Sequence, residues 1–301
     1  MNYSGDAAEQ IKKGNRVYLD FMHNPKGLEQ GFEKLSSEAY TYLERSGALF
    51  GTPIARLRKM NEGAVELYSD HGIDLNTEYL QIAVCAQHCN GGVAVDDHWQ
   101  SDIEGLYAAG EAAGTFGIYR PGGSALNSTQ VGSLRAAEHI AAQKETVRKE
   151  PVYQLPQIQY GPSNIEEITD VLQTEMSRVA DFDRSTRGME DLLDNVSKLR
   201  DHFFEYVTIE DKTQHQALFR LYDMVLTQRS VLSAMLCSAQ SKGTCGSALI
   251  DRQPCGDEKN AGMTRTLTRG AYSEQAPISP MPDPELWFET LLARKRKESG
   301  I

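Results

Sequence analysis

The sequence lacks any long apolar run and any excess of basic charge. None of its apolar stretches approaches the roughly 20 residues needed to cross a bilayer, and its start, MNYSGDAAEQ, lacks the charged-then-apolar order of a secretory signal. Its 31 Lys and Arg residues are outnumbered by 42 Asp and Glu residues, which gives a net charge of −11. This balance argues against a nucleic-acid or anionic-membrane surface, and the basic run at 294–297 is too short to reverse it. We therefore expect a cytoplasmic protein without a membrane span.

Cysteine is also scarce. The five Cys residues of this 301-residue chain are an odd number and do not form a disulfide scaffold, which fits a reducing compartment. Cys85, His88 and Cys89 are neighbours in the sequence, but a zinc site needs further ligands, and Cys245 and Cys255 lack the tight CxxC spacing. We interpret these thiols as small apolar side chains in or beside a strand. No metal site is predicted.

The sequence also lacks the turn that is typical of dinucleotide-binding folds. Such a fold opens with a strand, a G-x-G-x-x-G turn and a helix, with an acidic residue about twenty positions later. The sequence contains no such stretch. If a dinucleotide is bound, this chain does not provide the usual pyrophosphate loop.

The most informative stretch that is present runs from residue 82 to residue 142. Within it, GGVAVD and GLYAAGEAAG are short apolar runs closed by Gly or Asp, the pattern of buried strands and their turns. A glycine-rich loop from Gly114 to Gly123 follows, and from Ser124 onward the apolar spacing is helical. A strand, a Gly loop and a helix in this order build a cradle for an anion or phosphate.

These residues also carry a resemblance to a known family. GGV-x-VD, then D-x-EGLYAAGE and then R-x-G-x-(S/A)-L-x-S resemble the flavin-contacting C-terminal motifs of the fumarate reductase/succinate dehydrogenase flavoprotein family, which includes L-aspartate oxidase. The match is specific over this stretch and thinner elsewhere, where it rests on KGNRVYLDF near the start and on the order of elements. The cofactor that the resemblance implies is FAD.

The resemblance implies an α/β (α+β) fragment built from three parts of that family's fold. We expect residues 1–81 to be the remnant of a capping domain and residues 82–150 to be the C-terminal segment of the FAD-binding domain. Residues 151–250 should form the helical domain, and residues 251–301 an extended tail. The family's FAD pyrophosphate site and most of its parallel sheet are then missing from this sequence.

Apolar spacing predicts several helices independently of the resemblance. Residues 15–21 are expected to be a strand, and residues 27–49 and 53–70 to be helices. Helical spacing recurs three times after residue 160 and indicates a small bundle, with Ser163 as the cap of its first helix. These three runs are 165–179, 189–207 and 217–239.

Four residues are expected to bind the cofactor. Glu111 follows an apolar run and carries the position of the family's FAD-contacting Glu, where it can accept hydrogen bonds from a ribityl hydroxyl. If Ser124 caps the next helix, the backbone N–H groups of Ala125 and Leu126 point outward and suit the N1/O2 edge of a reduced flavin. The structural alternatives are an acid that interacts with a helix dipole and an ordinary capped helix.

Three residues are expected to bind a substrate. The resemblance places Arg120, a catalytic residue in this prediction, on a substrate carboxylate, a task that suits a planar guanidinium. Gln87 falls on the family's substrate-binding His position and His88 lies one place later, so the strand alternation can direct His88 away from the flavin. A structural ion pair is the alternative for Arg120.

Two classes of function remain open. In one, the chain is the C-terminal portion of an FAD-dependent oxidoreductase that transfers hydride between flavin and a small carboxylate-bearing substrate similar to fumarate or succinate. In the other, it is a non-catalytic partner subunit or truncated remnant that does not bind FAD alone. In either case we expect it to associate, with itself or with an N-terminal FAD-binding half on a separate chain.

Overall fold

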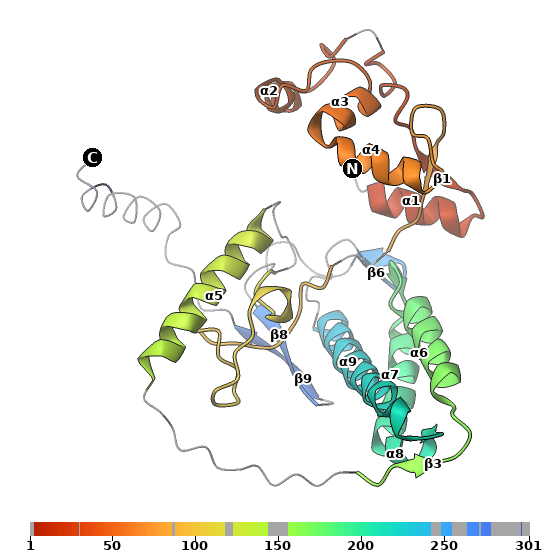
Figure 1. Ribbon diagram of the computed structural model, residues 1–301, viewed down its shortest axis with the longest axis vertical. Coiled ribbons are helices and arrows are strands. Elements are labelled where there is room, and N and C mark those ends of the chain that lie inside the picture. Colours follow the sequence, from red (N-terminus) through yellow and green to blue (C-terminus); the bar gives the residue numbers. More distant parts are fainter. Residues whose placement is uncertain are drawn as a thin grey trace. The chain divides into compact units, whose positions relative to one another are not determined.

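The chain divides into two compact units, Met1–Ala86 and Gln87–Ile301 (Figure 1). The computed structural model describes residues 3–29, 31–85, 88–117, 123–143, 156–241, 248–254, 264–270, 272–277 and 296. Within these ranges no helix has both the length and the apolar character that a membrane span requires. The finer domain boundaries expected from the sequence stay predictions.

The first unit combines four helices and a two-stranded antiparallel sheet within its described residues. The strands pair with Val17 opposite Ile82, and a small core of Ile54, Val65 and Leu75 lies among the helices. The strand expected around residues 15–21 is therefore present in its central part. The elements are α1 (Tyr3–Lys12), β1 (Val17–Leu19), α2 (Ser37–Arg45), α3 (Pro53–Met60), α4 (Glu62–Asp70) and β2 (Leu80–Ile82).

Two helix predictions in this unit need correction. The helix expected over 27–49 is confined to α2, because Gly27 has a φ of 92° and the Ser36 side chain caps the helix only further along the chain by accepting from the Ala39 N–H. The helix expected over 53–70 is broken at Asn61, which ends α3. The Asn61 side chain accepts from the Ala64 N–H and so begins α4.

The second unit begins with turns and isolated bridges where the sequence predicts buried strands. Val93 pairs with Ala113 in parallel, and Gln100 pairs with Tyr107 in antiparallel fashion, but neither pair extends into a ladder. Val93 is 44% exposed, which corrects the prediction that GGVAVD is a buried strand. A short helical turn η1 (Gly110–Ala112) and the long helix α5 (Ser124–Ala142) follow, and this helix matches the predicted one.

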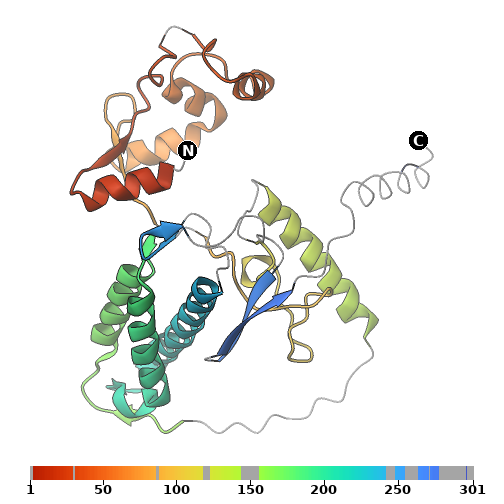
Figure 2. The same ribbon diagram turned by 180° about the vertical axis from the view of Figure 1, so that it is seen from behind.

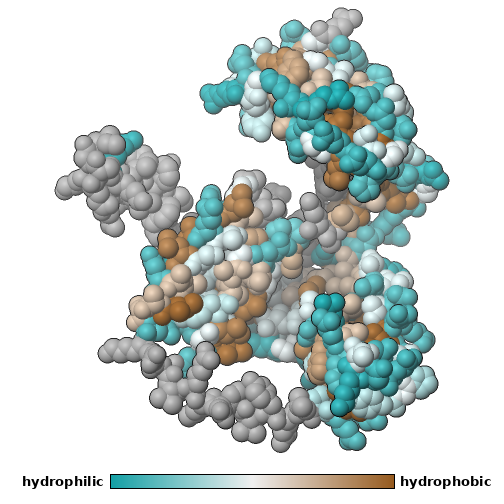
Figure 3. All heavy atoms as spheres, in the orientation of Figure 1, coloured by the Kyte–Doolittle hydropathy of each residue, from teal (hydrophilic) through white to brown (hydrophobic). Residues whose placement is uncertain are grey.

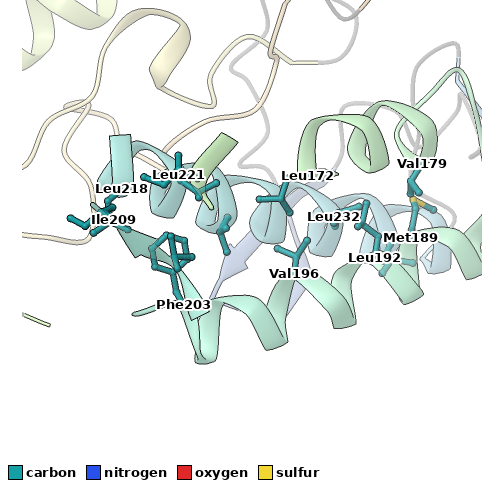
Figure 4. Close-up of a cluster of buried hydrophobic side chains, with 14 residues drawn as sticks. Leu172, Val179, Met189, Leu192, Val196, Phe203, Ile209, Leu218, Leu221 and Leu232 are labelled. Atoms are coloured by element: carbon teal, nitrogen blue, oxygen red, sulfur yellow. The ribbon is translucent and has the colours of Figure 1, made fainter. Parts of the chain in front are cut away.

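The helical bundle is the largest core of the chain's described part. Helices α6, α7 and α9 lie side by side (Figure 2), and Phe203, Leu218 and Leu232 are each at most 1% exposed. Figure 4 shows these side chains pointing into the space between the helices. The predicted bundle is therefore confirmed. Its helices are α6 (Ile165–Val179), α7 (Thr186–Asp201), α8 (Phe203–Tyr206) and α9 (His215–Gln240).

The predicted cap of the first bundle helix is wrong by one residue. Asn164, not Ser163, occupies the N-cap of α6, and its side chain makes no cap hydrogen bond. It is instead held by the loop after α8, donating to the Tyr206 carbonyl at 2.8 Å and accepting from the Thr208 N–H at 3.0 Å. A tertiary contact thus replaces the local capping box.

Short strands complete the second unit. A hairpin packs against α9, and a hydrogen bond between the Ser233 and Ser273 hydroxyls, 2.7 Å apart, joins the two. No pattern in the sequence predicts this hairpin. The tail beyond Pro277 lies almost wholly outside the described residues. The strands are β3 (Gln159–Tyr160), β4 (Asp183–Arg184), β5 (Thr208–Ile209), β6 (Leu249–Ile250), β7 (Gln253–Pro254), β8 (Thr264–Arg269) and β9 (Tyr272–Pro277).

Candidate functional site

The start of α5 is the first component of the candidate site. Gly123 occupies the N-cap with a left-handed φ of 81°, and no side chain of the described residues forms a cap hydrogen bond there. Ser124 is therefore the first helical residue and not the cap that the sequence predicts. The first intrahelical bond runs from the Asn127 N–H to the Gly123 carbonyl, so the N–H groups of Ala125 and Leu126 are in the first turn, where the helix dipole favours negative charge.

Glu111 is the second component. It lies in η1, the turn that packs against α5, and its side chain is 52% exposed. Its Oε1 atom accepts from the Cys89 N–H at 2.9 Å. The carboxylate therefore lies in an accessible position beside the segment that contains His88.

His88 is the third component. Its ring stacks on Phe116 with centroids 5.2 Å apart, and its Nε2 atom lies 3.4 Å from Glu111 Oε2. That distance is short enough for a charge interaction, but within the described residues neither ring nitrogen makes a hydrogen bond, although both are buried. The Asn90 side-chain oxygen is buried without a partner in the same sense. Buried polar atoms of this kind need partners, so the site offers hydrogen-bonding groups to a ligand.

A close backbone approach holds these components together. The Val93 N–H donates to the Ala112 carbonyl at 2.8 Å, and the Gly114 N–H donates to the Val93 carbonyl at 3.0 Å. A Cβ atom added to Gly92 would lie 2.3 Å from the Ala112 carbonyl oxygen. Glycine is therefore required at position 92 to bring the segment from His88 to Val93 beside Glu111.

The adjacent glycines provide a matched test of this approach. We expect Gly92→Ala to lower the free energy of unfolding by about 1–3 kcal/mol, since the obstructing atoms are backbone and cannot move aside cheaply. Gly91→Ala adds its Cβ into open space and should change stability by less than about 0.5 kcal/mol. Urea unfolding of both variants measures this difference, and equal stabilities would show that the approach is not tight.

A second layer of residues packs on α5 and supports the site. Trp99 packs on Gly132, where an added Cβ would lie 2.3 Å from the indole Nε1, and the Arg135 guanidinium lies 5.7 Å from the indole ring. Burial acts to raise the pKa of Asp96, but the N–H groups of Gln100 and His98 outweigh it and lower this pKa below its ordinary value. No residue of this layer was predicted from the sequence, where the available signal was the single Trp close to the GGVAVD stretch.

The structure describes five of the seven residues predicted to bind ligands. It brings His88 and Glu111 together and places Ser124, Ala125 and Leu126 in the first turn of the neighbouring helix. Gln87 and Arg120 lie outside the described residues, as do Cys245 and Cys255. Within the described ranges no group of three or more His, Cys, Asp or Glu side chains is arranged to hold a metal ion.

The family model of the FAD binding domain matches residues 3–126 of the chain. One chain of the fumarate reductase (CoM/CoB) of Methanothermobacter marburgensis is 28% identical over 190 residues, which are 59% of this chain and 35% of that protein. L-aspartate oxidase of Acinetobacter baylyi is 27% identical over 184 residues, or 57% of this chain and 32% of that protein. The chain thus matches about a third of the length of each curated relative.

Solved structures show the same fold. A quinol–fumarate reductase structure with menaquinol molecules matches with a TM-score of 0.62 at 18% identity, over 92% of this chain and 57% of that one. The E. coli quinol fumarate reductase matches with a TM-score of 0.59 at 20% identity, over 91% and 56%. The chain is thus similar to the fumarate reductase/succinate dehydrogenase flavoproteins over part of their length, and the family model together with these flavoproteins indicates FAD as its cofactor.

Proposed function

We propose that this chain provides the C-terminal part of an FAD-dependent oxidoreductase that transfers hydride between flavin and a small carboxylate-bearing substrate of the fumarate/succinate type. The observation that carries this proposal is the pair formed by the Glu111 carboxylate and the His88 ring. Glu111 lies in η1, the turn that packs against α5, and α5 begins at the left-handed Gly123. An accessible carboxylate, a polar ring without a hydrogen-bond partner in the described residues and a positive helix end offer complementary contacts to one polar ligand.

The residues present fit a flavin. The half-exposed Glu111 carboxylate can accept a hydrogen bond from a ribityl hydroxyl, and the close backbone approach at Gly92 holds the His88 segment beside this carboxylate. The N–H groups of Ala125 and Leu126 suit the negatively charged edge of a reduced isoalloxazine. FAD, when bound, supplies the hydride chemistry, and the role of this chain is to orient and stabilise.

The substrate contacts are assigned to Arg120, Gln87 and His88. A guanidinium can hold a carboxylate in a bidentate manner, and the His88 ring nitrogens, which have no hydrogen-bond partner in the described residues, can add a hydrogen bond to the substrate. The guanidinium supplies the positive charge that suits an anionic substrate, and the Gln87 amide can add a further hydrogen bond to a carboxylate.

The second candidate is a non-catalytic subunit or remnant. It is favoured by the missing G-x-G-x-x-G turn, since the N–H groups of that turn anchor the pyrophosphate. The visible spectrum and the turnover with an artificial electron donor distinguish the two candidates when a dinucleotide-binding half is supplied. A protein that binds flavin and reduces fumarate supports the oxidoreductase, whereas a colourless, inactive assembly supports the alternative.

One face of α5 indicates where an FAD-binding half associates. Leu126, Leu134 and Ile140 are 69%, 60% and 52% exposed, while Gly132 and Ala136 of the same helix are buried. Figure 3 shows hydrophobic residues along this part of the surface. A helix with small residues inside and large apolar residues outside is suited to lie between two layers.

We expect this face to drive association of the chain, with itself or with the FAD-binding half. Leu134→Asp should weaken the association about ten- to hundredfold, because burial of a Leu side chain contributes about 1.5–3 kcal/mol. Met60→Asp is the control, since Met60 is 80% exposed and lies in the first unit. Sedimentation at micromolar concentration measures both, and a monodisperse, folded monomer of the unmodified chain with and without the added half would contradict the expectation.

A further inference from the structure

The helical bundle contains a groove that the flavin site does not use. It lies between α6 and α7, has a volume of about 610 Å³, and is lined on its apolar side by Ile168, Val171, Leu172, Leu192, Val196 and Leu199. Leu172 and Val196 belong to the bundle core, but Val171 is 57% exposed. The groove therefore extends the core to the surface as an apolar strip that no described segment covers.

The rim of this groove is acidic. Glu167, Glu175 and Asp191 line it. The one cation among the lining residues, Arg178, is already engaged with Glu175, with Nη2 and Oε2 2.6 Å apart. An apolar strip with a negative rim favours an occupant that combines apolar side chains with positive charge.

The C-terminal segment of this chain has that composition. In LWFETLLARKRK, residues 286–297, the spacing of Trp287, Phe288, Leu291 and Leu292 predicts one apolar face of a short helix. Four consecutive cations follow at 294–297. This basic run is unusual in a chain with a net charge of −11, and most of the segment lies outside the described residues.

We infer that residues 287–297 bind the groove between α6 and α7 of their own chain, with Trp287 and Leu291 against Val171 and the cations at the acidic rim. The nine residues 278–286 span up to about 30 Å when extended. The preceding strand β9 packs on α9, which in turn packs on α6 and α7, and packed helix axes lie about 8–10 Å apart. The groove is therefore within reach, and the tether gives the segment an effective concentration on the order of millimolar.

Tryptophan fluorescence of the full chain tests this contact. Only Trp99 and Trp287 are present, so the difference between the unmodified chain and its Trp287→Phe variant isolates the emission of Trp287. We expect this emission to be blue-shifted and shielded from acrylamide. Val171→Asp should lower the docking equilibrium constant about tenfold or more, because a carboxylate would be buried against apolar side chains, and the shielding should fall accordingly.

Two further variants keep the test decisive. Leu67→Asp is the matched control, because Leu67 has the same 57% exposure but lies on α4 in the first unit, and it should leave Trp287 shielded. Leu291→Asp removes the apolar face from the tail without touching the bundle, and it should expose Trp287 as Val171→Asp does. Raised salt should weaken the shielding, since the rim contacts are exposed charges.

Several outcomes would overturn the inference. One is that Trp287 is already exposed to acrylamide in the unmodified chain. Another is that Trp287 stays shielded in the Val171→Asp variant while the bundle remains folded. Shielding lost on dilution would assign the groove to the tail of a second copy. Shielding that appears only with vesicles of anionic lipid would assign the tail to a membrane surface.

Discussion

Replacement of Arg120 by Lys is expected to lower turnover by tens to hundreds fold and to leave the flavin spectrum unchanged. The protein for this measurement is the chain completed with a dinucleotide-binding half, as a separate chain or a fusion. Lys keeps the positive charge, so flavin binding should persist, but it lacks the planar fork that holds a carboxylate through two bonds. The loss of that contact costs on the order of 2–4 kcal/mol of transition-state stabilisation.

Arg135→Lys is the control for this substitution. Arg135 lies on α5 over the Trp99 ring, in the layer that supports the candidate site. Its replacement should affect stability more than turnover. Unchanged turnover of the Arg120→Lys variant with a normal flavin spectrum would remove Arg120 from the mechanism, and a loss of stability alone would identify it as a structural ion pair.

The bundle was predictable from the sequence because its signal is local and repeated. Leu192, Val196 and Leu199 on α7, like Leu218, Leu221 and Val225 on α9, follow helical spacing, and all but Leu199 are at most 6% exposed. When the apolar period and the burial pattern agree over several turns, few other folds compete. The ends of the helices were less predictable, because Asn164 is engaged by the loop after α8 and not by its own helix.

The strand predictions failed where individual side-chain hydrogen bonds decide the backbone. GGVAVD has the composition of a strand, but the Asp96 side chain accepts from the N–H groups of His98 and Gln100 and turns the chain. The β8–β9 hairpin was not predicted, because its strands lack the composition pattern of buried strands. Its Thr and Ser side chains give no apolar alternation, and it is held by contacts such as that of Ser273 with Ser233 on α9.

One part of the candidate site was predictable from the sequence, and the other part was not. Glu111 stands out because glycines and an apolar run surround it, and the structure places it beside the His88 ring. The closeness of Gly92 to Ala112 and of Trp99 to Gly132 joins positions far apart in the sequence, and no local pattern encodes such pairs. The roles assigned to Gln87 and Arg120 stay predictions.

The second expected result is low FAD affinity in two proteins, the isolated chain and the Glu111→Gln variant of the completed protein. The 301-residue chain alone should not retain FAD through purification, because it has no G-x-G-x-x-G turn to hold the pyrophosphate. The chain completed with a dinucleotide-binding half should bind FAD, and Glu111→Gln should weaken that binding about ten- to hundredfold, since a hydrogen bond to a charged group contributes about 1.5–3 kcal/mol. Glu104→Gln makes the same change of charge at an exposed loop position and should leave the affinity unchanged.

Titration of FAD into the completed protein therefore tests most directly whether this chain carries part of a flavin site at Glu111. The dissociation constant can be followed by quenching of flavin fluorescence, with the isolated chain, the Glu111→Gln variant and the Glu104→Gln variant measured in parallel. We predict no binding by the isolated chain, tight binding by the completed protein, and weakened binding only for Glu111→Gln. Equal dissociation constants for the two variants, or an isolated chain that releases stoichiometric FAD on denaturation, would contradict the account.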